Sequence, residues 1–220
     1  MRVGCGGVLF DMDGVLLDST PAVERAWRWW AQRHGLDADE VVHRAHGRPS
    51  LATVRDYLPQ ADERRIEAEN RMVEAREIAD VEGIRALAGA RELLESLPEA
   101  RWAVVTSCTR ALAEVRYAAG GLKRPRWLIT ADDVTHGKPA PEPYLLGARR
   151  LGLAAGECVV VEDVAAGVRS GKAAGARVLG LARTATAAEL RKAGADWMAD
   201  GVARVRVVAA DGADLELEIG

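Results

Sequence analysis

The sequence predicts an α/β protein in which a doubly wound parallel sheet carries an inserted α-helical cap domain. Short apolar segments alternate with amphipathic helical patterns over most of the 220 residues, as in a parallel sheet covered by helices on both faces. The alternation stops between residues 38 and 80, where only helical patterns occur. Because this stretch follows the first strand closely, we expect residues 1–17 and 83–220 to form the core and residues 18–82 the cap.

The first strand of the core is predicted at Val8 to Phe10, and two aspartates follow it. The apolar run stops at Asp11 and Asp13, and Gly14 comes next. Beyond the end of a strand, side chains at i and i+2 can both face a cleft at the carboxyl edge of the sheet, where open α/β sheets bind ligands. Two carboxylates beside a hydrophobic strand are costly unless a metal or a reaction needs them. A solvent-exposed Asp-x-Asp-Gly turn is the alternative interpretation.

Four helices are predicted for the cap. We expect the first to start with Thr20 as N-cap and Pro21 at the first helical position, and to end near residue 35. Val23, Trp27 and Trp30 recur at i, i+4 and i+7 and mark its buried face. The other three helices are expected at 39–45, 50–58 and 62–78.

The rest of the core resumes the alternation of strands and helices. We predict strands at 102–106, 127–130, 158–161 and 177–181, and helices at 88–97, 109–119, 141–151 and 165–174. Two further strands, at 202–208 and 215–219, are expected to form a terminal hairpin joined around Asp211-Gly212.

The composition excludes several classes of protein. The net charge is −3, which gives no signature for binding nucleic acid. No apolar run approaches the roughly 20 residues that a membrane helix needs, and no signal peptide is apparent. The three cysteines have no metal-type spacing, and their odd number argues against a disulfide framework. We therefore expect a cytoplasmic protein, with a monomer as the default oligomeric state and a weak homodimer as the alternative.

Three more polar clusters follow predicted strands. The segment Thr106-Ser107-Cys108-Thr109 opens a helix, where hydroxyls and free backbone N–H groups can bind an anion or simply cap the helix. Lys138 lies in a loop before another helix, and Glu162-Asp163 end a buried strand. Together with Asp11 and Asp13, this set suits phosphoryl transfer. Carboxylates can hold Mg²⁺, while hydroxyl, N–H and lysine groups neutralise phosphoryl oxygens.

The same segments resemble a known family. They are Phe10-Asp11-Met12-Asp13-Gly14-Val15, Thr106-Ser107, Gly137-Lys138-Pro139-Ala140-Pro141 and Glu162-Asp163 with Gly167. In this order they are similar to the four motifs of the haloacid dehalogenase-like hydrolase superfamily, and the helical insert is similar to the cap of its small-molecule phosphatases and β-phosphoglucomutase. The resemblance implies a Rossmann-like core and a magnesium-dependent phosphatase.

The resemblance also implies roles for individual residues. Asp11 would be the nucleophile and Asp13 the general acid/base, while Ser107 and Lys138 would bind the phosphoryl group. Thr106 could supply the hydroxyl instead of Ser107. The implied Mg²⁺ ligands are Asp11, Asp13, Glu162 and Asp163, although Glu162 need not bind the metal directly.

Three further segments are Asp18 to Trp27, His46-Gly47-Arg48 and Val105 to Arg110. They resemble the glycerol phosphate and 2-deoxyglucose-6-phosphate phosphatases, which suggests a small sugar or polyol phosphate as substrate. Arg48 of the cap could close over this substrate and Glu24 could meet its hydroxyls, although both could be ordinary exposed helix residues. Gly14 and Cys108 would also border the substrate. The helix start beside Cys108 could lower the pKa of the thiol, or the cysteine could simply be a small structural residue.

Three alternative functions stay open. Dehalogenases of the superfamily lack an aspartate at the position of Asp13, which makes dehalogenation a poor fit. The sugar phosphomutases have a histidine where this chain has Val23, which favours hydrolysis over a mutase reaction. A catalytically silent phosphate-binding protein on the same fold is the third alternative, because fold alone does not confer activity.

Overall fold

The predicted parallel sheet runs through the larger part of the molecule, and it has six strands, one more than the five that the sequence predicted. The computed structural model describes residues 1–45, 49–211 and 214–220. The strand order is β6-β5-β2-β7-β8-β9, and every neighbouring pair is parallel. The chain starts in the middle of the sheet and builds outwards to either side, which makes the sheet doubly wound. Its strands are β2 (Gly7–Phe10), β5 (Trp102–Val105), β6 (Leu128–Ile129), β7 (Cys158–Glu162), β8 (Arg177–Leu181) and β9 (Trp197–Ala199).

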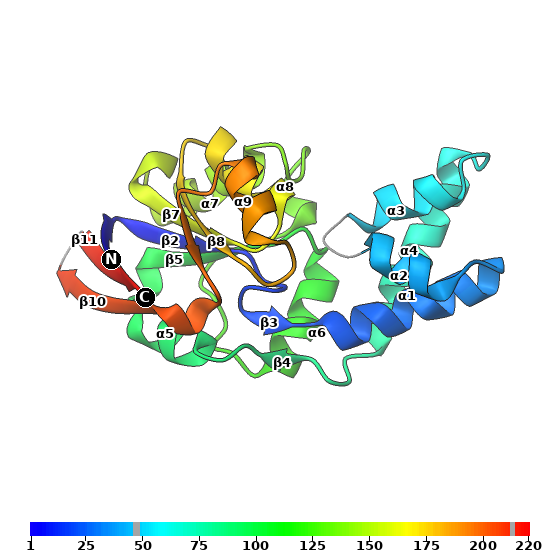
Figure 1. Ribbon diagram of the computed structural model, residues 1–220, viewed down its shortest axis with the longest axis horizontal. Helices are drawn as coiled ribbons and strands as arrows, with labels where there is room; N and C mark the ends of the chain where they lie inside the picture. The colour runs from blue at the N-terminus through cyan, green and yellow to red at the C-terminus, as the bar shows by residue number, and fades with distance from the viewer. Residues whose placement is uncertain (46–48, 212–213) are drawn as a thin grey trace.

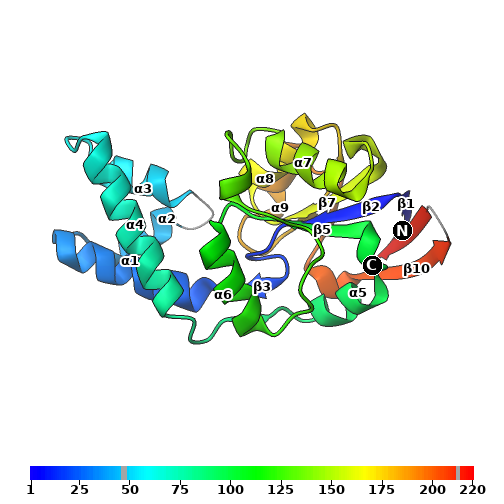
Figure 2. The ribbon, with the colours of Figure 1, turned by 180° about the vertical axis from the view of Figure 1, so that it is seen from behind.

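Helices cover both faces of this sheet. Figure 2 shows α7 (Glu142–Leu151) and α8 (Ala165–Ala173) on one side of the strands, and α5 (Ala90–Ser96) and α6 (Arg110–Gly120) on the other. α9 (Ala187–Ala193) packs with α8. Successive side chains of a strand point to opposite faces. Val8 and Phe10 of β2 therefore join the hydrophobic cluster under α5 and α6, while Leu9 joins the cluster under α7.

Both chain ends meet in a second, antiparallel sheet. It consists of β1 (Arg2–Cys5), β10 (Val205–Asp211) and β11 (Asp214–Ile219) in the order β1-β11-β10. The predicted terminal hairpin is confirmed, but its first strand starts later than expected, because residues 202–204 form a 3-10 helix. Figure 1 shows both termini at the end of the molecule that lies away from the helical insert.

The insert consists of four helices packed around a hydrophobic cluster of their own. They are α1 (Thr20–His34), α2 (Ala38–Ala45), α3 (Ser50–Tyr57) and α4 (Glu63–Ala79), which Figure 1 shows beside the sheet. Trp27 and Trp30 belong to this cluster, and the buried Trp30 indole donates a hydrogen bond of 3.0 Å to Glu69 of α4. The bounds of all four helices lie within about one residue of the predicted ones, but the predicted N-cap of α1 was wrong. Ser19 is the N-cap, Thr20 is the first helical residue, and the Ser19 side chain makes no capping hydrogen bond.

The two connections between the insert and the sheet lie side by side. β3 (Leu17–Asp18), on the way out, pairs antiparallel with β4 (Arg85–Ala86), on the way back. Arg85 also donates a hydrogen bond of 2.8 Å to Asp18. Among the described residues, no helix combines the length and the apolar character that crossing a membrane requires.

Candidate active site

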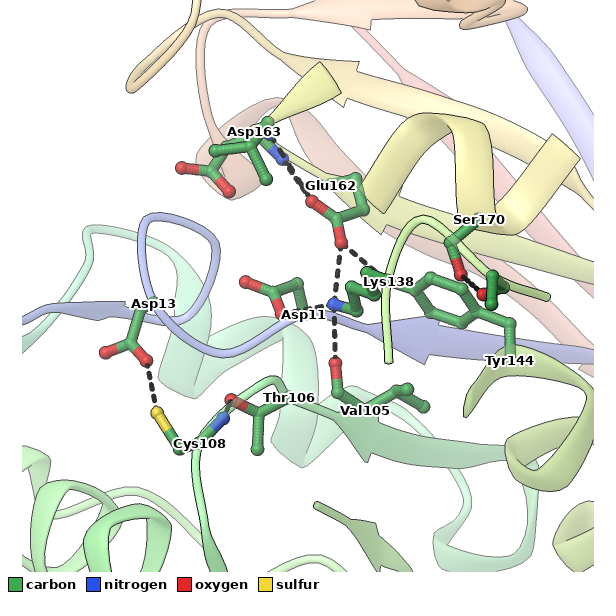
Figure 3. Close-up of polar contacts among 12 residues, drawn as sticks. Asp11, Asp13, Val105, Thr106, Cys108, Lys138, Tyr144, Glu162, Asp163 and Ser170 are labelled. Carbon is green, nitrogen blue, oxygen red and sulfur yellow. Dashed lines mark hydrogen bonds and ion pairs between the residues drawn. The ribbon is translucent and has the colours of Figure 1, made fainter. Parts of the chain in front are cut away.

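Three predicted site residues are in direct contact at the carboxyl edge of the sheet. Asp11 follows β2, Glu162 ends β7, and Lys138 comes from the loop before α7. The Lys138 ammonium donates hydrogen bonds to Asp11 Oδ1 at 2.6 Å, to Glu162 Oε1 at 2.7 Å and to the Val105 carbonyl at 2.9 Å (Figure 3). All three N–H groups of the lysine are thus used, which holds its side chain in one position.

Burial and neighbouring charges set the ionisation of this group. Burial by itself lowers the pKa of Lys138, but the carboxylates of Asp11 and Glu162 outweigh it and hold the pKa above its usual value. Burial raises the pKa of Asp11 to about 7; Lys138 opposes this shift, and the charge of Glu162 adds to it. The lysine is therefore a fixed cation beside the carboxylate.

Glu162 is fully buried, and the protein itself supplies its hydrogen-bond donors. Besides Lys138, the Tyr144 hydroxyl donates to Oε1 at 2.7 Å, and the backbone N–H groups of Asp163 and Val164 donate to Oε2 at 3.1 and 3.4 Å. A Cβ atom on Gly167 would lie 1.7 Å from Oε1, so α8 can pack on this carboxylate only with glycine there. Glu162 thus holds Lys138, and its role as a metal ligand stays a prediction.

Three carboxylates form a group that could hold a metal ion. Oxygen atoms of Asp11, Glu162 and Asp163 all lie within 4.8 Å of one another. Asp163 is buried, and its Oδ1 has no hydrogen-bond partner among the described residues. Burial, followed by the charges of Asp11 and Glu162, raises the pKa of Asp163 well above its usual value. A buried, unpartnered carboxylate oxygen next to other carboxylates fits a hard cation such as Mg²⁺.

Asp13 lies outside this metal-binding group. Its Oδ2 accepts a hydrogen bond of 3.3 Å from the Cys108 thiol (Figure 3) and one of 2.9 Å from Arg116. Its Oδ1 is buried and has no partner in the described part of the chain. The structure therefore separates the two aspartates by environment: a lysine binds Asp11, and an arginine binds Asp13. The role of Asp13 as a metal ligand stays a prediction.

The loop after β5 presents the two candidate hydroxyl groups differently. Thr106 is buried, and its hydroxyl accepts a hydrogen bond of 3.1 Å from the Cys108 N–H. Ser107 is exposed and lines the cavity described next. Thr109 is the N-cap of α6, as the start of a helix there predicted. The exposed hydroxyl of Ser107 is thus the more available of the two.

Cys108 has no lowered pKa. Burial raises the pKa of its thiol, and the nearby positive charge of Arg116 opposes this shift without reversing it. The idea that the helix start activates the thiol was therefore wrong, because burial has the larger effect. Cys108 instead contacts Asp13 and Arg116.

A cavity of about 390 Å³ lies between the sheet and the helical insert. Its floor includes the predicted site residues Asp11, Asp13, Gly14, Thr106, Ser107, Cys108, Lys138 and Asp163. From the insert it is lined by Val23, Trp27, Ser50, Leu51, Asn70, Glu74 and Glu77, among others. Glu24 is not among its lining residues, and its contact with substrate hydroxyls stays a prediction. Arg48 lies outside the described residues.

One model of a protein family matches most of the chain. Residues 6–175 match the model described as haloacid dehalogenase-like hydrolase. The chain belongs to the haloacid dehalogenase-like hydrolase family. The match covers all four motif segments and the whole helical insert, so the resemblance of the motifs is confirmed.

Curated relatives of this hydrolase extend over most of its length. The chain is 49% identical to hexitol phosphatase A of Escherichia coli over 177 residues, which are 80% of this chain and 82% of the relative. It is 36% identical to glycerol-1-phosphate phosphohydrolase 2 of Saccharomyces cerevisiae over 211 residues, which are 90% of this chain and 83% of the relative.

Solved structures share the fold of the hydrolase. A HAD family hydrolase from Deinococcus radiodurans with bound phosphate and sodium superposes with a TM-score of 0.71 at 29% identity, over 90% of this chain and 92% of the other. A hydrolase from Pseudomonas syringae gives a TM-score of 0.79 at 25% identity, over 90% and 94% of the two chains.

Two residues of the site were missed by the sequence analysis. Arg116 lies on the buried face of α6, and Tyr144 lies on α7 against Glu162 and Lys138. A charged residue among the apolar positions of an amphipathic helix is a usable signal, and it marks Arg116. The sequence gives no comparable signal for Tyr144, because a tyrosine in a buried helix face is ordinary.

Proposed function

We propose that this hydrolase is a Mg²⁺-dependent phosphatase that cleaves a small sugar or polyol phosphate through an aspartyl-phosphate on Asp11. The observation that carries the proposal is the pair of aspartates in one cavity with different partners. Asp11 is bound by Lys138 and belongs to the metal-binding group, whereas Asp13 lies outside that group and keeps one carboxylate oxygen unpartnered among the described residues. One carboxylate is thus suited to nucleophilic attack and the other to proton transfer.

The metal-binding group fits Mg²⁺. Asp11 and Asp163 would hold the ion, and Glu162 and Asp13 remain candidates for further ligands. When bound, Mg²⁺ neutralises charge on the phosphoryl oxygens. Mg²⁺ is a hard cation that prefers oxygen ligands. Asp163 Oδ1 is a carboxylate oxygen without a hydrogen-bond partner among the described residues, so it can serve as such a ligand.

The side chains of the protein divide the reaction into two steps. In the first, Asp11 attacks phosphorus in line, the bond to the substrate oxygen breaks, and Asp13 protonates the leaving alkoxide. In the second, Asp13 takes a proton from a water that attacks the aspartyl-phosphate, and phosphate leaves. Ser107 binds the phosphoryl oxygens, and the positive charge of Lys138, which stays hydrogen-bonded to Asp11, offsets repulsion between Asp11 and the anionic substrate.

The substrate class follows from the cavity wall and the relatives. The insert contributes Ser50, Asn70 and Glu74 to the cavity, and these polar groups can pair with several hydroxyls of a polyol. Two of the relatives are named hexitol phosphatase A and glycerol-1-phosphate phosphohydrolase 2. A neutral, hydroxyl-rich leaving group fits both observations.

We propose that residues 18–82 act as a cap domain over the core formed by 1–17 and 83–220. Supporting this division, the four helices of the insert have their own hydrophobic cluster. The β3–β4 pair stands where the chain passes between the two parts. Movement at this pair would open the cavity and let substrate enter.

A sugar phosphomutase is the second candidate, and the cavity disfavours it. Val23, at the position where the phosphomutases have a histidine, lines the cavity. Its side chain cannot move a proton between substrate and intermediate, and water is then the better acceptor for the phosphoryl group. A silent phosphate-binding protein is disfavoured because Asp11, Asp13, Lys138 and Asp163 all line the cavity.

A screen of phosphorylated metabolites tests the proposal. Free phosphate is measured with Mg²⁺ for hexitol phosphates, glycerol phosphates, hexose and pentose phosphates, and phosphoglycolate, with Asp11→Asn as the inactive control. We expect release from one or more polyol or sugar phosphates and none from the control. Isomerised sugar phosphate without free phosphate would point to the mutase. Mg²⁺ binding without turnover of any ester would point to the silent protein.

A further inference from the structure

An arginine side chain is buried in the wall of the cavity, on the apolar face of α6. Arg116 shares this face with Leu112, Ala113 and Tyr117, and its side chain is 5% exposed. Burying a guanidinium is costly unless charged partners and hydrogen bonds compensate. The contacts of Arg116 therefore indicate what the residue is for.

The guanidinium joins Asp13 to the cap. Nη1 donates to Asp13 Oδ2 at 2.9 Å and to the Cys108 sulfur at 3.2 Å. Nη2 lies 3.3 Å from Oε1 of Glu77, a buried residue of α4. One planar group is thus held from the core side and from the cap side at once.

These contacts use one carboxylate oxygen of Asp13 and leave the other without a hydrogen bond among the described residues. Oδ2 accepts hydrogen bonds from both Arg116 and Cys108, whereas Oδ1 has no hydrogen-bond partner in the described part of the chain. A carboxylate fixed through one oxygen presents the other in a defined direction. An acid that must meet a leaving oxygen at hydrogen-bond distance needs this orientation.

We propose that Arg116 is a positioning residue, which holds Asp13 through Oδ2 so that Oδ1 exchanges the proton with the leaving group and with water. Glu77 holds the other side of the same guanidinium, so the packing of α4 on α6 maintains the arrangement. This inference rests on the proposed role of Asp13 as general acid/base. It adds a residue that the sequence motifs do not contain.

The leaving group separates a positioning role from a structural one. An alkoxide must be protonated as it leaves, whereas p-nitrophenolate is a stable anion that leaves without an acid. The parameter kcat/KM reports only the steps up to formation of the aspartyl-phosphate, so later hydrolysis does not affect it. We therefore compare kcat/KM for a polyol phosphate identified by the screen with kcat/KM for p-nitrophenyl phosphate.

Arg116→Met is the main variant, with Asp13→Asn as the reference and Arg110→Met as the control. Arg110 also lies on α6, but it pairs with Asp133 at 2.7 Å. For the polyol phosphate we expect Asp13→Asn and Arg116→Met each to lose roughly 100-fold in kcat/KM, and about 10-fold or less for p-nitrophenyl phosphate. Arg110→Met should match the wild type on both substrates.

The outcomes separate the inference from the function on which it rests. Equal losses on both substrates in Asp13→Asn would overturn the acid/base role itself. A selective loss in Asp13→Asn, together with equal losses or no loss in Arg116→Met, would overturn only the inference. If Arg116→Met does not fold, Arg116→Lys decides: it keeps the charge but loses the planar fork. A larger loss on the polyol phosphate then supports the inference, and equal losses or none overturn it.

Discussion

Gly14 and Asp163 fit together only because the glycine has no side chain. A Cβ atom on Gly14 would lie 1.9 Å from Oδ2 of Asp163, far inside van der Waals contact. Gly14 also has φ of 79°, a conformation that favours glycine. The turn after the two aspartates is thus shaped around the carboxylate that follows β7.

Gly14→Ala should therefore damage the metal-binding group as well as the backbone. We expect it to displace Asp163 and to reduce Mg²⁺ affinity and turnover by at least ten-fold. Gly35→Ala is the matched control, since Gly35 has φ of 65° but no atom within 4 Å of its Cβ position. Both variants carry backbone strain of about 1 kcal/mol, and only Gly14→Ala adds the clash. Mg²⁺ titration and phosphate release check this, and equal behaviour of the two variants would count against it.

Two buried tyrosines offer a matched test of the hydrogen bond to Glu162. The Tyr144 hydroxyl donates to this carboxylate, whereas the buried Tyr117 hydroxyl has no partner among the described residues. Tyr144→Phe should lower the free energy of unfolding by about 2 kcal/mol, because hydrogen bonds to charged groups contribute roughly 1.5–3 kcal/mol. Tyr117→Phe should leave the free energy of unfolding unchanged or raise it. Urea denaturation measures both, and a larger cost for Tyr117→Phe contradicts the account.

Magnesium should stabilise the folded protein through Asp163. A ligand that binds only the folded state, at a hundred times its Kd, adds about 2.7 kcal/mol. We expect Mg²⁺ to raise the Tm of the wild type, and EDTA to reverse the rise and abolish turnover. In Asp163→Asn, Mg²⁺ should no longer raise the Tm, and turnover should be lost. Asp196→Asn, which changes a carboxylate paired with Lys172 at 2.8 Å, should keep both the Mg²⁺-dependent rise in Tm and the turnover. An unchanged Mg²⁺ response in Asp163→Asn would contradict the ligand assignment.

The two hydroxyls after β5 should behave in opposite ways. Ser107→Ala should reduce kcat/KM by about ten-fold or more without changing stability, because its exposed hydroxyl binds the phosphoryl group. Thr106→Val should instead lower the free energy of unfolding by about 1 kcal/mol, since the Cys108 N–H loses its acceptor. Kinetics and urea denaturation of both variants decide between them. If the catalytic loss follows Thr106, the hydroxyl assignment is wrong.

The sequence predicted the parts of the site that depend on the ends of strands. Asp11, Lys138 and Asp163 each follow an apolar strand or precede a helix, and a doubly wound sheet brings such loops to one edge. Chain order and strand type are sufficient for that inference. The contact of Lys138 with both Asp11 and Glu162 is the structural result.

The residues that the sequence did not predict depend on how elements are packed. Arg116 reaches Asp13 because α6 packs under the turn after β2, and it reaches Glu77 because α4 packs against α6. A local sequence pattern does not predict which helices pack together. The β3–β4 pair and β9 were missed because strands of two or three residues show too little alternation to be recognised. β6 is equally short, but it was predicted as part of the longer segment 127–130. β1 contains Gly4, which weakens a strand signal.

The nucleophile is tested most directly by trapping the phosphorylated enzyme. The wild-type protein is mixed with a slight excess of the polyol phosphate and Mg²⁺, quenched in acid within one turnover, digested and analysed by mass spectrometry. We predict a phosphoryl group on the peptide that contains Asp11, and none in Asp11→Asn, which should keep the wild-type Tm to within a few degrees. Turnover in Asp11→Asn at the wild-type rate, or a trapped phosphoryl group on another residue, would contradict the account.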